Sequence, residues 1–168
     1  MGALLNRRRV MGGNKEVVDT RIIATFIVTN DSATTKILYS TSGITSVEID
    51  GVVQTVATNY QLYVGSHEVK IGLSNNTVTP QYMFNGCSTL HDVVLPSTIQ
   101  TLSNGTFQSL SAFYNITCYA TTPPVFSGVP FRYTTIRGAI YVPFESVDVY
   151  KSASGWSTNA SKIQAIPT

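Results

Sequence analysis

The residues best suited to acid–base or nucleophilic chemistry are two histidines and two cysteines. His67 follows Gly65 in a polar stretch, and His91 begins a short apolar run. Catalysis needs a nucleophile, a base and an orienting group that converge, but no Ser-His-Asp, Cys-His or His-x-x-x-His pattern joins these residues. The spacing of Cys87 and Cys118 fits no metal motif, so we expect two buried free thiols. The sequence therefore predicts no enzyme, no metal site and no cofactor.

Asp50 and Gly51 carry a second possible chemistry, because an aspartate in a turn is able to bind a cation. Residues 46–49 alternate polar and apolar side chains before them, and two valines follow. An Asp-Gly pair between two such segments is typical of a tight β-hairpin. We therefore predict a hairpin turn here and not a cation site.

The arginines Arg7, Arg8 and Arg9 concentrate positive charge near the start of a chain whose net charge is only +2. Three interpretations are open: a nucleic-acid contact, a solvated tail, or an arm that docks on a partner protein. Arginine neutralises phosphates, but no aromatic residues are interleaved with these three, so we do not predict nucleic-acid binding. We predict an extended docking arm over residues 1–20, in which arginine forks onto carboxylates or backbone carbonyls.

The composition indicates a folded, β-rich protein with a weakly charged surface. Charged residues make up 12% of the chain and hydrophobic residues 43%, a profile that does not fit a disordered segment. No apolar run reaches the length of a membrane helix. The short apolar patch at residues 3–5 is too brief for a signal peptide. We therefore expect a protein made in the cytoplasm that does not bind membranes.

Residues 21–66 are predicted to form a small antiparallel β-domain, built as hairpins or as a β-sandwich. Residues 22–28 alternate apolar and mixed side chains, which is typical of a strand. The segments 60–64 and 68–71 flank Gly65-Ser66-His67, and this arrangement predicts a second hairpin.

Residues 67–168 contain a repeat. The segment that starts at Phe84 aligns with the segment that starts at Phe107, at an offset of 23 residues. Short strands are expected after each segment and again near residue 140, so the period matches that of leucine-rich repeats. Stacked strands would bury one apolar column, and Phe84 and Phe107 would fill the opposite wall. The column is expected to contain Ile71, Leu73, Val93, Leu95, Ile116, Cys118, Ile140 and Val142.

The alternate positions of the repeat strands are expected to face outward and to meet a partner. One predicted row contains Lys70, Asp92, Asn115 and Ala139, the next contains Gly72, Val94, Thr117 and Tyr141, and Tyr119 lies just beyond. An ordinary solvated face remains the alternative. At the end of the chain, residues 145–151 are predicted to form a short helix, with Val147, Tyr150 and Trp156 capping the open end. The predicted fold class is thus mainly β: the small N-terminal β-domain, a short leucine-rich-repeat solenoid and a capping helix.

The repeat region resembles a known family. The segment MFNGCSTLHDVVLPSTIQTLSNGTFQSL is similar to BspA-type leucine-rich repeats, which read roughly Phe-x-Gly-Cys-x-x-Leu and then Ile-x-Ile-Pro. TTPPVF and IYVPFESVDVYKSASGWSTNASKIQAI resemble the C-terminal closure of such proteins. The chain departs from the pattern in having two clear repeats, the second with Leu110 where cysteine is expected. The opening LLNRRRVMGG resembles small virion-associated proteins of Bacteroidales-infecting, crAss-like tailed phages.

These resemblances imply a non-enzymatic structural protein of a phage virion: a capsid decoration, a head fibre or a tail-associated protein. The N-terminal arm would bind other virion proteins, and the body would contact copies of itself, or a host surface glycan or protein. The alternative is a bacterial cell-surface adhesion module of the same repeat family, which a signal peptide would support. A cytoplasmic protein-interaction module is a third possibility.

Overall fold

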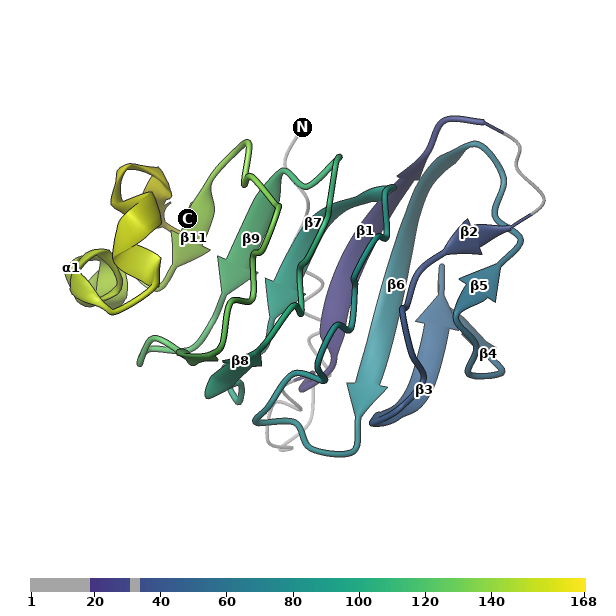
Figure 1. Cartoon of the computed structure of the whole chain (residues 1–168), viewed down its shortest axis with the longest axis horizontal. Helices are drawn as coiled ribbons and strands as arrows, with labels where there is room; N and C mark the ends of the chain where they lie inside the picture. The colour runs from purple at the N-terminus through teal and green to yellow at the C-terminus, as the bar shows by residue number, and fades with distance from the viewer. Residues whose placement is uncertain (1–18, 31–33) are drawn as a thin grey trace, which may run out of the picture.

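The computed structural model describes residues 19–30 and 34–168, and strands dominate its fold (Figure 1). Eight strands form one large mixed sheet in the order β12-β11-β9-β7-β1-β6-β3-β4, and two small sheets pair β8 with β10 and β2 with β5. The strands are β1 (Ile22–Val28), β2 (Thr35–Lys36), β3 (Ile44–Ile49), β4 (Val52–Gln54), β5 (Asn59–Tyr60), β6 (Gly65–Leu73), β7 (Leu90–Leu95), β8 (Thr101–Ser103), β9 (Asn115–Cys118), β10 (Val125–Ser127), β11 (Ile140–Val142) and β12 (Ile163–Ala165). The fold is mainly β, as the sequence predicts.

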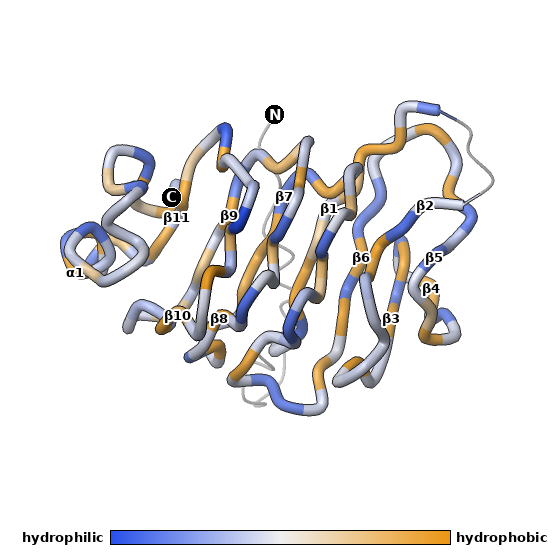
Figure 2. Tube along the Cα trace, viewed as in Figure 1, coloured by the Kyte–Doolittle hydropathy of each residue, from blue (hydrophilic) through white to orange (hydrophobic). Residues whose placement is uncertain are grey.

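Strand β1 lies in the middle of the large sheet. Every second residue of Ile22–Val28 is buried on the inner face, and Figure 2 shows apolar and polar residues alternating along the strands. The strand pairs antiparallel with β6 on one side and with β7 on the other. The strands expected in residues 21–66 and those expected in residues 67–168 therefore share one sheet, and the boundary between the two regions falls inside β6.

One of the two predicted hairpins is confirmed and the other is wrong. Asp50 and Gly51 adopt positive φ angles of 50° and 84°, which suit a type I′ turn between β3 and β4. Residues 65–67, in contrast, are the first part of β6 and pair with residues 26–28. They extend rather than turn because β1 offers them a strand partner, while β5 pairs with β2.

The strands of the C-terminal half recur at the interval that the sequence predicts. Strands β7, β9, β11 and β12 pair in parallel, and the equivalent residues Val93, Ile116 and Ile140 are at most 1% exposed. Between these strands the chain returns along a second wall, where the Phe84 amide donates to the Thr106 carbonyl over 2.9 Å. Each turn of the chain is thus hydrogen-bonded to the next along both walls.

A column of aromatic rings fills the space behind the sheet. Phe84 and Phe107 are both fully buried, as predicted, and their ring centroids lie 5.7 Å apart in a stacked arrangement. Phe131, which the sequence analysis did not include, continues the stack 5.1 Å from Phe107. Its position extends the repeat by one more turn of the chain.

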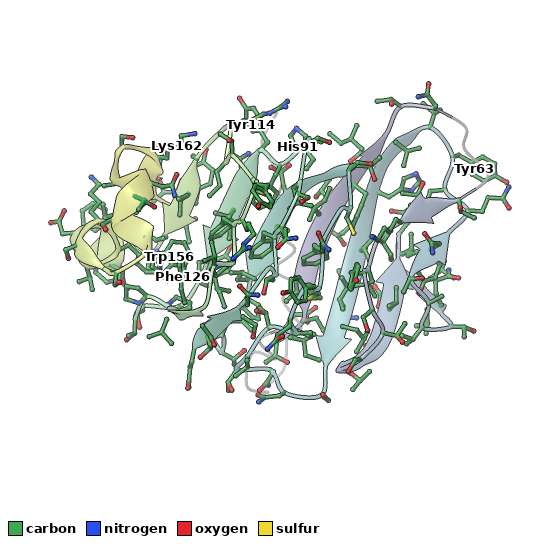
Figure 3. The ribbon with its side chains drawn as sticks, viewed as in Figure 1. Tyr63, His91, Tyr114, Phe126, Trp156 and Lys162 are labelled. Carbon is green, nitrogen blue, oxygen red and sulfur yellow. The ribbon has the colours of Figure 1, made fainter. Side chains whose placement is uncertain are left out.

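The C-terminal end of the column is covered by 3-10 helix η1 (Phe144–Ser146), helix α1 (Val147–Ser152) and 3-10 helix η2 (Trp156–Lys162). The predicted cap residues Tyr150 and Trp156 are buried, and Val147 packs against the core. Trp156 (Figure 3) donates its indole N–H to the Pro124 carbonyl over 2.8 Å. The Tyr150 hydroxyl donates to the Ala120 carbonyl over 2.8 Å, so the predicted closure is confirmed.

Candidate binding surface

The outer face of the large sheet carries four uncharged residues on β7, β9 and β11, which we call the outer patch: Val94, Thr117, Tyr119 and Tyr141. Val94 lies opposite Thr117, and Thr117 lies opposite Tyr141. Tyr119 continues the ladder of β9 through a backbone hydrogen bond to Leu95 of 3.1 Å. Alternate residues of a strand face opposite sides of the sheet. Because the residues before and after each of these four are buried on the inner face, the four side chains lie on the outer face, where all are partly exposed.

The hydroxyl groups of the outer patch are not used within the fold. Among residues 19–30 and 34–168, no hydrogen bond or ion pair joins the side chains of Thr117, Tyr119 or Tyr141 to another residue. Each hydroxyl is able to donate one hydrogen bond and to accept others. The structure therefore brings together three of the predicted partner-binding residues with their polar groups open to a ligand or a partner.

Two further predicted residues, Asp92 and Asn115, hold the repeat together. Asp92 Oδ1 accepts a hydrogen bond from the Asn115 backbone N–H over 3.1 Å. One turn later, Asn115 Oδ1 accepts from the Ala139 N–H over 2.9 Å. A side-chain oxygen that accepts a hydrogen bond from a backbone N–H of the next turn is already used within the fold. We therefore assign these two side chains to the fold rather than to partner binding.

An aromatic pair lies beside these side chains at one end of β7 and β9 (Figure 3). The rings of His91 and Tyr114 stack with centroids 5.1 Å apart, and His91 Nδ1 lies 2.8 Å from Asp92 Oδ2. The next turn carries Gly138 at this position, where a side chain would clash with the Tyr114 ring. The sequence analysis did not include Tyr114, although its offset of 23 residues from His91 was a usable signal.

Lys70 does not neighbour Asp92, because β1 lies between β6 and β7. It belongs to a charged cluster on β3, β6 and the start of β1. Lys70 Nζ lies 3.2 Å from a Glu68 carboxylate oxygen and 3.7 Å from a Glu48 oxygen. Arg21 bridges Glu48 and Asp19, each at 2.8 Å.

Each charge of this cluster has a partner of opposite sign. The hydrogen bond from Arg21 lowers the pKa of Glu48 and, likewise, the pKa of Asp19. Lys70 adds a further favourable charge beside both carboxylates. The outer face therefore carries a charge-paired cluster on β3 and β6, and the outer patch, whose own residues are uncharged, lies on the other side of β1.

The remaining predicted partner-binding residues, Arg7, Arg8 and Arg9, lie outside the described residues. Within the described residues, no group of three or more His, Cys, Asp or Glu side chains is placed to hold a metal ion. Cys87 and Cys118 are buried and unpaired, as predicted. Burial raises the pKa of the Cys87 thiol to about 12, which suppresses the reactive thiolate.

No family model matches the chain, and no curated protein matches it. Over residues 19–30 and 34–168, no helix combines the length and the apolar character needed to cross a membrane.

Proposed function

We propose that this chain is a non-enzymatic structural protein of a tailed-phage virion, with a body folded as a short solenoid of BspA-type leucine-rich repeats. The stacked turns support the solenoid, because Phe84 and Phe107 occupy equivalent places 23 residues apart and their rings stack. The hydrogen bonds from Asp92 to Asn115 and from Asn115 to Ala139 repeat at the same interval. Repeated contacts between neighbouring turns are what stabilise a solenoid.

The outer patch is the observation that carries the binding role. Tyrosine is enriched at protein interfaces, whereas charged side chains are depleted at their centres. The outer patch offers tyrosine and threonine hydroxyls with no partner among the described residues, beside a cluster whose charges are already paired. Its partners would be other virion proteins, further copies of this chain, or a host surface. A particle carries many copies, so weak contacts would sum through avidity.

The chemistry of the titratable residues supports a non-enzymatic role. His67 contacts Asp50 and the Tyr63 carbonyl, at 2.7 Å and 2.9 Å. His91 contacts Asp92 and stacks on a tyrosine. Among the described residues, neither histidine is hydrogen-bonded to a serine, threonine or cysteine that it would activate as a nucleophile.

The virion assignment rests on the resemblance of LLNRRRVMGG to phage proteins and on the predicted arm at residues 1–20. Deletion of residues 2–13 tests the arm. We expect the shortened chain to keep the circular dichroism of the full chain, because the core of the described residues begins at Ile22, and to be lost from purified phage particles. Replacement of Arg7, Arg8 and Arg9 by lysine serves as the charge-matched control. Unchanged incorporation of the deletion variant would disprove the docking role.

A further inference from the structure

A hollow of about 510 Å³ opens between the loop at residues 39–43 and the segment at residues 74–81. It lies where β6 ends and β3 begins, at the lower edge of the sheet in Figure 1. The residues of its wall that matter here are Tyr39, Ser42, Ser74, Asn75 and Gln81. None of them belongs to the outer patch.

Backbone hydrogen bonds fix both sides of the hollow. The Ser74 N–H donates to the Gly43 carbonyl over 2.9 Å, which ties the two segments together. The Tyr39 N–H donates to the Met83 carbonyl over 2.8 Å, which holds the loop against the first repeat turn. A site that is already formed loses less entropy when a ligand binds.

Tyr39 supplies an aromatic surface at the hollow. Its side chain is 51% exposed, so a large part of the ring is open to solvent. The Lys36 ammonium lies 4.9 Å from the ring centroid, and the Tyr82 ring lies 6.1 Å away at a tilt of 55°. These two neighbours hold the ring in place. An exposed, oriented tyrosine offers both an apolar face and a hydroxyl.

Four polar side chains of the wall keep donors or acceptors that the described chain does not use. Asn75 Oδ1 accepts from the Thr77 N–H and hydroxyl over 3.0 Å and 2.8 Å, which leaves its NH₂ group to donate. No hydrogen bond within residues 19–30 and 34–168 engages the side chains of Ser42, Ser74 or Gln81. In the repeat, by contrast, the side-chain oxygens of Asp92 and Asn115 already accept hydrogen bonds from backbone N–H groups.

The wall of the hollow contains no charged side chain. A charged ligand would have to lose hydration among these uncharged groups, which is costly, and the Lys36 ammonium lies against the Tyr39 ring and is not part of the wall. A saccharide suits these groups better, because its hydroxyls both donate and accept hydrogen bonds and its C–H face packs on an aromatic ring. We propose that this hollow binds a neutral saccharide, with one sugar ring on Tyr39 and its hydroxyls on Ser42, Ser74, Asn75 and Gln81. The inference goes beyond the proposed function and does not depend on the virion assignment.

The test is an NMR titration of the full ¹⁵N-labelled chain with four neutral probes: maltotriose, lactose, chitobiose and methyl α-mannoside. We expect at least one probe to shift the backbone amide signals of residues 39–43 and 74–81. The Tyr39→Ala variant should weaken that binding roughly ten-fold. The Gln81→Ala variant, which removes no side-chain hydrogen bond within the described residues, should also weaken it.

The control is Tyr63→Ala, which removes another exposed tyrosine, 74% exposed, that lies between β5 and β6 and is not part of the wall of the hollow. It should leave the titration unchanged. The proposal is overturned if none of the four probes shifts these amides. It is overturned equally if the shifts persist at full strength in both Tyr39→Ala and Gln81→Ala.

Discussion

At the scale of single residues, polar side chains divide into those that hold the fold and those left for a partner. Asp50, Asp92 and Asn115 each satisfy a backbone N–H of a neighbouring strand. Thr117 and Tyr141 satisfy none in the described chain. A polar residue type alone does not reveal this difference, because the same side chain serves either role depending on which backbone group lies opposite.

His67 provides a prediction about pH. Partial burial disfavours the charged form of His67 and so lowers its pKa. The hydrogen bonds to Asp50 and to the Tyr63 carbonyl, together with the negative charge of Asp50, favour the charged form and outweigh the effect of burial. The pKa of His67 is therefore raised above its ordinary value of 6.5. Because the folded pKa exceeds the unfolded one, the stabilisation is complete below pH 6.5 and is lost as the pH rises through the folded pKa. An NMR titration of the His67 ring measures this directly.

The matched variant is Asp50→Asn, since asparagine tolerates the positive φ of the turn. It should bring the His67 pKa down toward the ordinary value while the hairpin persists. A wild-type pKa at or below 6.5, or a pKa unaffected by Asp50→Asn, would contradict this account of the turn.

At the scale of elements, local sequence patterns predict most of the strands, whereas pairing between distant segments determines which strands are neighbours in the sheet. The alternation of Ile22–Val28, the Asp50-Gly51 turn and the strands at 23-residue intervals are local signals, and all three are confirmed. The insertion of β1 between β6 and β7 is a choice of partner between distant segments. No local pattern encodes that choice, which is why residues 65–67 were predicted to turn and why Lys70 was placed beside Asp92.

The link between neighbouring turns can be tested at Asn115. Asn115→Ala should lower the free energy of unfolding by about 1–3 kcal/mol, because it leaves the Ala139 N–H without its acceptor. Asn115→Thr keeps a hydroxyl acceptor, adds no charge opposite Asp92 and should cost less. Denaturant unfolding measures both values. Equal losses in the two variants would show that the hydrogen bond is not what stabilises this turn.

The aromatic column makes a separate prediction. Phe107 is fully buried and stacks on Phe84, Phe113 and Phe131, so Phe107→Ala should lower the free energy of unfolding by about 3–5 kcal/mol. Phe144 is 83% exposed, and Phe144→Ala should change it by no more than about 0.5 kcal/mol. A loss for Phe107→Ala as small as that for Phe144→Ala would mean that the column contributes little.

At the scale of the whole molecule, one sheet joins an antiparallel part to a parallel repeat, and the two ends of the repeat are closed differently. Helix α1 and Trp156 cover the C-terminal end. At the other end, the segment after β2 contacts the first repeat turn through the Tyr39–Met83 hydrogen bond. A stack of so few turns exposes both ends, so closure at each is needed for stability. The outer patch and the saccharide hollow then occupy separate parts of the surface.

The outer patch predicts how this body associates. Tyr141→Lys places a charge at the β11 end of the uncharged outer patch and should weaken association with its partner, whether a virion protein or a second copy of the chain. Tyr133→Lys, at a tyrosine that is 80% exposed elsewhere, is the matched control. Co-sedimentation of each variant with purified particles gives the comparison. Equal co-sedimentation of both variants would exclude the outer patch as the contact.

The virion assignment is tested most directly by quantitative mass spectrometry of phage particles purified from the source by density gradient. We predict that peptides of this chain follow the major capsid protein through the gradient at a constant copy ratio. If the chain is abundant in the infected-cell lysate and absent from every particle fraction, it is not a virion protein.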